Sequence, residues 1–145
     1  MTQQFPPPSL KRLNKVIVAL QRIGIVVGTM RLLTVYGRKS GKPRTTPVSP
    51  FTVDGERYVI SAATTEWVKN ARVRNEGVLA RGRRSERVRL VDVPEHERGA
   101  ILREFPLKVP HGVDMLIMSG AVEDGTQDAF EAAAPNCAVF RVERL

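Results

Sequence analysis

The chain has 145 residues, 42% of them hydrophobic and 26% charged, which is ordinary for a soluble globular protein and enough for one domain with a core. The formal net charge of +8 favours an anionic partner, such as a phosphorylated cofactor, a nucleic acid or an acidic membrane surface. A single cysteine, Cys137, excludes an internal disulfide and favours a reducing compartment, and its apolar neighbours predict a buried, inert thiol.

The N-terminal segment predicts an extension that precedes the main domain. Residues 1–8 include three consecutive prolines and favour a loose lead-in, after which Ser9 can cap a helix over 9–23. This helix has an apolar and a basic face, so it suits packing on the domain or on a second subunit, or peripheral contact with a membrane. We therefore divide the chain into an extension over 1–23 and a domain over 24–145. No secretory signal is recognisable, so we expect a cytoplasmic protein, with any peripheral contact at the inner membrane face.

The first half of the domain predicts a β-meander followed by a helix. Strand-forming residues predict strands over 30–36, 45–53 and 57–63. Asp54 and Gly55 predict a tight turn between the last two strands. Thr64 or Thr65 can then cap a helix that runs to residue 76, where Gly77 is a stop signal.

The second half predicts a hairpin, three helices and a closing strand. The hairpin joins strands over 78–81 and 88–93 through a turn at 82–85. Alternation places its arginines at 87 and 89 on one strand face, which we expect to be solvent-exposed. Helices are expected over 94–104, 111–119 and 126–134, the last capped by Thr126, with a loop over 105–110. The final strand covers 137–142. Six strands with helices at the margins predict an α+β fold, mainly antiparallel: a small barrel with flanking helices.

The segment over 36–47, Tyr-Gly-Arg-Lys-Ser-Gly-Lys-Pro-Arg-Thr-Thr-Pro, places four cations and two glycines between two predicted strands. Glycine lets backbone N–H groups approach oxygen atoms closely, while arginine supplies a planar fork of donors and lysine a point charge. This layout is typical of a site that holds an anion. A hairpin turn coated with solvated charge is the alternative.

Two further groups of residues can carry binding chemistry. Trp67 and Asn70 share a face of their predicted helix, where an indole and an amide can contact a ring; the alternative is a core tryptophan beside a surface asparagine. The arginine cluster over 81–89 suits nucleic acid, but no aromatic residue interleaves with it, so a solvated hairpin is preferred.

The chain offers little acid–base equipment of its own. Neither His96 nor His111 has neighbours at metal-ligand spacing, so we predict no metal site. No nucleophile elbow or phosphate-binding Gly-Lys-Thr loop is present. An enzyme with this sequence would depend on a cofactor, and hydride transfer fits because it needs positioning more than ionisable groups. Catalytic residues stay unassigned.

Three blocks, over 33–48, 66–72 and 134–142, resemble the deazaflavin-dependent nitroreductase family of actinobacteria and archaea. The resemblance implies a split β-barrel that binds coenzyme F-420. A flavin mononucleotide enzyme with a similar barrel is a less favoured alternative. The resemblance also implies cofactor-binding positions. Those that would hold the phosphate and acidic tail are Arg38, Lys39 and Arg44, with Ser40 and Gly41 in the turn. Those that would border the tricyclic ring are Ala62, Ala63, Thr64, Trp67 and Asn70.

Two departures from the family bear on the substrate. The tyrosines that line the nitroreductase pocket have no counterpart in the C-terminal half, where residues 105–120 instead suggest an apolar pocket or an ordinary core. The form Trp67-Val68-Lys69-Asn70 is similar to a divergent branch for which lipid or fatty-acid binding has been proposed.

We therefore predict an F-420-dependent oxidoreductase that passes a hydride to a hydrophobic, electron-poor acceptor such as a quinone or unsaturated lipid. Pairing into a homodimer is compatible with this fold. The alternatives are a non-enzymatic lipid-binding protein at the membrane face and a basic nucleic-acid-binding module.

Overall fold

The structure is a computed structural model that describes Lys15 and residues 30–145. The predicted helix over 9–23, and with it the expected contact with a membrane, lies outside the described residues except for Lys15, which is helical and exposed. The boundary between the extension and the domain stays a prediction for the same reason.

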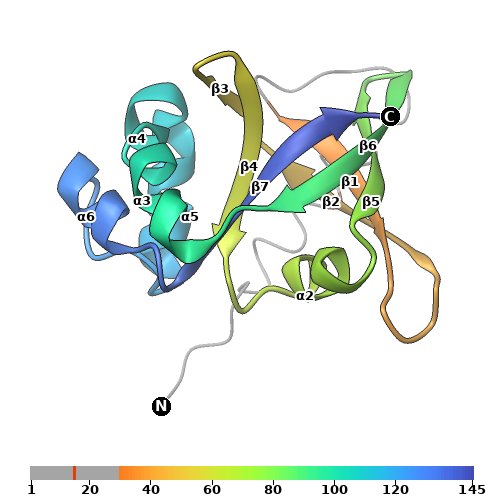
Figure 1. Cartoon of the computed structure of the whole chain (residues 1–145), viewed down its shortest axis with the longest axis horizontal. Coiled ribbons are helices and arrows are strands. Elements are labelled where there is room, and N and C mark those ends of the chain that lie inside the picture. The colour runs from red at the N-terminus through yellow and green to blue at the C-terminus, as the bar shows by residue number, and fades with distance from the viewer. Residues whose placement is uncertain (1–14, 16–29) are drawn as a thin grey trace.

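One antiparallel sheet forms the framework of the domain (Figure 1). Its strands are β1 (Arg31–Tyr36), β2 (Pro43–Val48), β3 (Phe51–Val53), β4 (Glu56–Ala62), β5 (Glu76–Arg81), β6 (Arg84–Asp92) and β7 (Cys137–Arg144). They lie in the order β2-β1-β5-β6-β7-β4-β3, so β2 and β3 are the two edges. The expected α+β class, mainly antiparallel, is confirmed.

The sheet must curl, because its two edges are consecutive in the chain. Only Ser49 and Pro50 separate Val48 of β2 from Phe51 of β3, and three peptide units span at most about 11 Å. Laid flat, six strand spacings would put the edges roughly 29 Å apart. The sheet therefore closes most of the way round, and since β2 and β3 do not pair with each other it forms a split barrel.

Predicting one strand over 45–53 was wrong, and residues 30–145 form seven strands instead of the six expected. The chain breaks at Ser49 and Pro50 as it passes from one edge of the sheet to the other. Pro50 has no N–H to offer to a ladder, which suits this corner. Pro47 is tolerated inside β2, opposite Leu32 of β1, because β2 is an edge strand.

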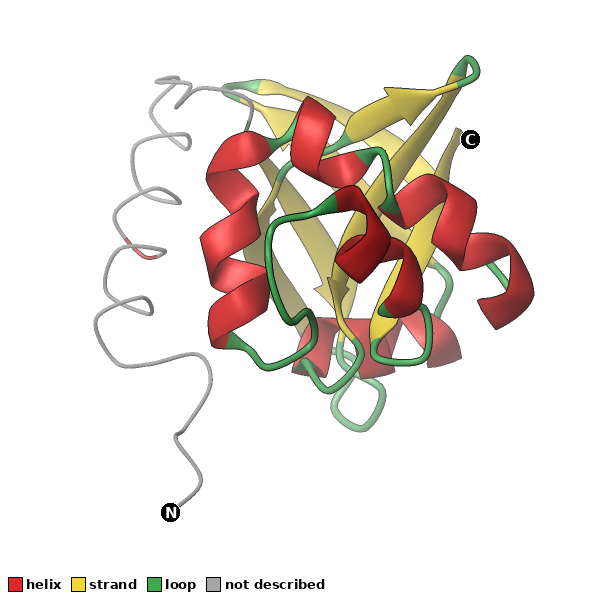
Figure 2. Cartoon of the chain, turned by 90° about the vertical axis from the view of Figure 1, so that its left-hand side faces the viewer, coloured by secondary structure: helices red, strands yellow, loops and turns green. Residues whose placement is uncertain are grey.

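The helices are α2 (Glu66–Val73), α3 (Glu95–Leu102), α4 (Phe105–Lys108), α5 (Val113–Met118) and α6 (Gln127–Ala132), with a 3₁₀ turn η1 (Pro110–Gly112). Four of them, α3 to α6, cover one side of the sheet, and α2 lies below the barrel (Figures 1 and 2). The loop predicted over 105–110 is wrong, since α4 begins at Phe105. Proline is compatible with the first turn of a helix, so Pro106 does not prevent it.

Gly77 is not the helix stop that its position suggested. The helix α2 ends at Val73, and Gly77 lies within β5, opposite Val35 of β1. A Cβ atom there would lie 2.6 Å from the carbonyl oxygen of Thr34. Glycine is therefore needed for the close approach of β1 and β5, because atoms at that distance overlap.

Two hydrophobic clusters sit on the two faces of the curled sheet. The first includes Leu33, Val59, Val88 and Phe140 from the strands, and Val68 and Ala71 of α2 join it, so α2 closes one end of the barrel. The second lies between the sheet and α3 to α6 and contains the buried Cys137. Burial raises the pKa of the Cys137 thiol to about 11, which agrees with the predicted inert thiol.

Candidate functional site

The basic segment forms the loop between β1 and β2, over residues 37–42. Its own backbone holds it closed: Gly37 N–H donates to the Lys42 carbonyl at 2.9 Å, and Gly41 N–H donates to the Gly37 carbonyl at 2.9 Å. Gly41 adopts a φ of +70°, a conformation that side-chain-bearing residues rarely take. The Ser40 hydroxyl accepts a hydrogen bond from Lys42 N–H at 3.2 Å. The loop is therefore a tightly folded turn, and its backbone hydrogen bonds fix the positions from which the basic side chains extend.

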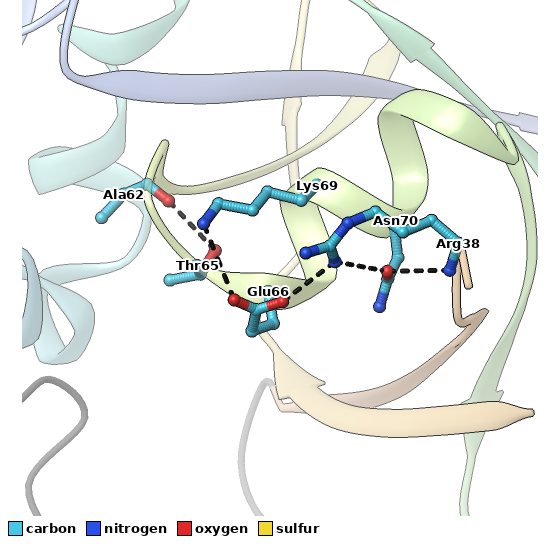
Figure 3. Close-up of polar contacts among 6 residues, drawn as sticks. All are labelled: Arg38, Ala62, Thr65, Glu66, Lys69 and Asn70. Carbon is cyan, nitrogen blue, oxygen red and sulfur yellow. Dashed lines mark hydrogen bonds and ion pairs between the residues drawn. The ribbon is translucent and has the colours of Figure 1, made fainter. Parts of the chain in front are cut away.

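Asn70 of α2 fastens this loop to the helix. Its side-chain oxygen accepts two hydrogen bonds from Arg38, one from the backbone N–H at 3.0 Å and one from Nη1 at 2.9 Å (Figure 3). Asn70 is only 6% exposed, so its amide oxygen depends on these donors for its hydrogen bonds. Arg38 and Asn70, two of the predicted cofactor-binding residues, are thus in direct contact across 32 positions of sequence.

Glu66 joins the same cluster, although no sequence signal singled it out. Its Oε2 accepts a hydrogen bond from Arg38 Nη1 at 2.9 Å, and its Oε1 lies 3.6 Å from Lys69 Nζ (Figure 3). The hydrogen bond from Arg38, helped by the two positive charges, lowers the pKa of the Glu66 carboxyl below its ordinary value. Their spacing of three residues on one helix can indicate the Glu66–Lys69 pair, but it does not link Glu66 to Arg38.

Trp67 points away from this polar cluster and into the barrel. Its ring packs against Phe140 of β7 with centroids 5.6 Å apart, and it borders the interior hydrophobic cluster. The side chain is nevertheless only half-buried. Trp67 and Asn70 therefore both face inward from α2, but one contacts the core while the other contacts the basic loop.

The segment over 62–65 is a tight connection between β4 and α2. Ala62 is buried, Ala63 N–H donates to the Asn136 carbonyl at 3.0 Å, and Thr64 is exposed. Thr65 occupies the N-cap position, as expected, but its hydroxyl donates to the Ala62 carbonyl at 3.0 Å and caps no helical N–H. These contacts fix where α2 starts, and with it the position of Glu66.

The other cations of the basic segment extend outward. Lys39, Lys42 and Arg44 are exposed, and within the described part of the chain their side chains form no hydrogen bond or ion pair. Arg74, just beyond α2, was missed by the sequence reasoning. Its Nη2 lies 3.8 Å from the point where a Cβ on Gly41 would stand, so its guanidinium lies against the loop.

This donor set fits a phosphorylated, acidic cofactor. Nη1 of Arg38 already serves Glu66 and Asn70, whereas Nε and Nη2 donate no hydrogen bond to the described residues. Those two groups form a planar edge that matches two oxygens of a phosphate or carboxylate. Four further cations, Lys39, Lys42, Arg44 and Arg74, lie on or against the same loop or β2. Charge and geometry together favour an oxyanion.

Segment 105–120 supplies mostly core. Phe105, Val109 and Leu116 are buried in the cluster under α3 to α6, while Leu107 and Met118 are exposed at 62% and 56%.

A surface hollow of about 340 Å³ lies away from both the basic loop and α2. Its lining residues are Tyr58, Val91, Asp92, Val93, Pro94, Glu97, Ala100, Ile101 and Arg141, none of them from α2 or the basic loop.

The arginine cluster and the metal and membrane candidates do not add to this site. Arg87 and Arg89 of β6 are exposed, as the alternation predicted. Over Lys15 and residues 30–145, no group of three or more His, Cys, Asp or Glu side chains could hold a metal ion. In the same part of the chain no helix has the length and apolar character needed to cross a membrane.

A family model described as F-420H(2)-dependent quinone reductase matches residues 14–111. Curated protein sequences gave no match. A protein of unknown function from Agrobacterium tumefaciens superposes with a TM-score of 0.57 at 14% identity, covering 99% of this chain and 57% of that one, so this chain spans little more than half its length.

Two further solved structures have similar folds over most of both chains. One, described as an F-420-H2 dependent reductase, has a TM-score of 0.53 at 18% identity and covers 82% of this chain and 98% of its own. The other, described as a domain-swapped dimer, has a TM-score of 0.56 at 15% identity, with 93% and 99% covered. At such low identity these likenesses establish the fold.

Proposed function

Because the chain belongs to the F-420H(2)-dependent quinone reductase family, we propose that it binds the deazaflavin coenzyme F-420 and reduces a hydrophobic, electron-poor acceptor, a quinone foremost. The resemblance of segments 33–48 and 66–72 leads to the same cofactor. A solved structure described as an F-420-H2 dependent reductase shares the split-barrel fold, which supports the proposal.

The observation that carries the proposal is the junction of the basic loop and α2. Asn70 holds Arg38 by two hydrogen bonds and leaves the Nε and Nη2 edge of its guanidinium open. We assign Arg38, Lys39 and Arg44 to the coenzyme's phosphate and acidic tail, with the turn of Ser40 and Gly41 between them. The connection of Ala62, Ala63 and Thr64, together with Trp67 and Asn70, would border the tricyclic ring.

The bound coenzyme in its reduced form supplies a hydride for the acceptor. The protein's own part is to bind, orient and exclude water. The basic loop would neutralise anionic groups and fix one end of the cofactor. The half-buried Trp67, which packs on the buried Phe140, would offer an apolar surface to a flat ring. No side chain of the described residues is assigned a proton-transfer role.

Titration of the oxidised coenzyme into purified protein tests the proposal through the deazaflavin fluorescence. We expect a saturable change, and binding weakened by about ten-fold or more in both R38A and R44A, since a hydrogen bond to a charged group contributes roughly 1.5–3 kcal/mol. R89A removes the same charge from the exposed face of β6 and is the matched control. Fluorescence that does not change at saturating protein, or equal losses in R89A, would contradict the assignment.

Flavin mononucleotide is the competing cofactor, and the same titration with that flavin separates the two. We expect weak binding of the flavin and a colourless protein as purified. Tight flavin binding without deazaflavin binding would replace the proposed cofactor.

We also propose pairing into a homodimer. The edge strands β2 and β3 are the unpaired ends of the sheet, and a structure of the same fold is described as a domain-swapped dimer. Sedimentation velocity over a range of concentrations tests this, and a monomer at every concentration would refute it. Membrane contact through residues 9–23 stays a prediction, for which flotation with anionic liposomes, with and without those residues, is the test.

A further inference from the structure

The Glu66 carboxylate occupies the Nη1 side of the Arg38 guanidinium, beside the Nε and Nη2 edge that is open to an incoming oxyanion. One of its oxygens contacts the Arg38 guanidinium at 2.9 Å and the other lies 3.6 Å from the Lys69 ammonium. In Figure 3 the carboxylate lies between these two cations. A phosphate or carboxylate group of a ligand would meet the same pair of positive charges.

Glu66 is also the member of the cluster that can leave most easily. Its side chain is 72% exposed, whereas that of Arg38 is 27% exposed. Exposed ion pairs contribute little to stability, because water solvates the separated charges almost as well. Turning the Glu66 side chain into solvent therefore costs little.

Arg38 would stay in place after such a movement. The amide oxygen of Asn70, 6% exposed, still accepts hydrogen bonds from the Arg38 backbone N–H and from Nη1. With Glu66 gone, Nη1 regains a free hydrogen in addition to those on Nε and Nη2. Asn70 thus holds the guanidinium in position, and Glu66 neutralises its charge from the Nη1 side.

We propose that Glu66 is a built-in counter-ion of the anion site, which neutralises Arg38 and Lys69 in the free protein and is displaced when a phosphate or carboxylate of the ligand binds. The inference rests on the proposed function only for the identity of that ligand. Such a counter-ion makes the site selective. A small anion must displace Glu66 without other contacts, whereas a ligand with several anionic groups also gains attraction from Lys39, Arg44 and Arg74.

The test compares E66Q with E95Q. Glutamine keeps the shape and one hydrogen-bond acceptor of Glu66 but removes the charge. Glu95 is an exposed residue in the first turn of α3, and the described residues give it no ion pair, so E95Q changes the net charge equally at a distant place. E66D retains the carboxylate and is the conservative variant. All variants are checked for the wild-type circular dichroism spectrum.

Binding of inorganic phosphate and, separately, of oxidised coenzyme F-420 is measured for each variant. We expect E66Q to bind inorganic phosphate about five-fold more tightly than wild type, the size of effect expected when one unit charge beside the site is removed in a well-solvated setting. E95Q should stay within about two-fold of wild type because salt screens a distant, exposed charge. E66D should also stay within about two-fold because it keeps the negative charge beside Arg38. In an R38A background, E66Q should have no effect, because the two residues act through one contact.

The outcomes separate this inference from the proposed function. If E66Q tightens phosphate binding through Arg38 while no variant binds the coenzyme, the counter-ion role stands and the proposed cofactor fails. If wild type binds the coenzyme but E66Q binds both probes no better or more weakly, the counter-ion role is overturned and the cofactor assignment stands. Equal tightening in E95Q, or tightening that persists with R38A, also overturns it.

Discussion

Replacing Asn70 with alanine should loosen the basic loop from α2 and destabilise the fold. The Asn70 side-chain oxygen accepts both the backbone N–H of Arg38 at 3.0 Å and its Nη1 at 2.9 Å. The alanine variant removes this acceptor and leaves the backbone donor without its partner. The guanidinium is less affected, since it keeps Glu66 and can reach water.

The magnitude follows from these two contacts. An unsatisfied buried donor costs about 1–3 kcal/mol, and the Arg38 N–H is partly buried. The hydrogen bond to the charged guanidinium adds part of roughly 1.5–3 kcal/mol. Because Arg38 is partly exposed, water recovers some of the second contribution. We therefore expect the free energy of unfolding to fall by about 2–4 kcal/mol.

Urea denaturation measures the loss, with Asn75→Ala as the control because the Asn75 side chain is exposed and makes no hydrogen bond within the described residues. Amide hydrogen exchange supplies a local readout: the Arg38 N–H should lose protection in N70A and keep it in the control. A loss below about 0.5 kcal/mol, with Arg38 still protected, would refute the reasoning, since this is the range of ordinary surface changes.

Three further predictions concern the scaffold. Gly77→Ala should lower the free energy of unfolding by about 2–3 kcal/mol in thermal denaturation, because its Cβ would lie 2.6 Å from the Thr34 carbonyl oxygen; an unchanged Tm would contradict this. Thr126→Ala should cost about 1 kcal/mol and Thr126→Ser much less, because the hydroxyl accepts the Ala129 N–H at 3.1 Å; equal losses would argue against capping. With a pKa raised to about 11, the Cys137 thiol stays protonated at pH 8, so it should react with a thiol reagent only after unfolding; rapid reaction of the native protein would be the contrary result.

The local signals in the sequence predicted those parts of the fold that depend on local chemistry. Asp54 and Gly55 both adopt positive φ values, 50° and 79°, as the tight turn between β3 and β4 requires. Thr126 caps α6 through its own side chain. Alternation from Cys137 onward predicted a strand over 137–142, and β7 starts at the same residue and ends two residues later.

The misses depend on contacts between distant segments. The break at Ser49 and Pro50 exists because the two edges of the sheet meet there, which no short window of sequence reveals. Gly77 looks like a helix stop until the backbone of Thr34 in a neighbouring strand is seen to require it. Glu66 lies 28 positions from Arg38, so their ion pair could not be read from spacing along the helix.

The binding residues divide in the same way. The cations of the basic loop were evident from sequence, and so was the helix that carries Asn70. The family resemblance implied only that Arg38 and Asn70 belong to one site, and the structure adds the direct contact between them. Arg74 escaped notice because its proximity to Gly41 depends on where α2 ends.

The most direct test of the account is a nuclear magnetic resonance titration of isotope-labelled protein with oxidised coenzyme F-420. We expect saturable shifts in backbone amides over residues 37–44 and 62–70, with Arg38 and Asn70 among the largest. Shifts that cluster instead around the hollow between β6 and α3, or an unchanged spectrum at saturating coenzyme, would contradict the claim that the basic loop and α2 form the cofactor site.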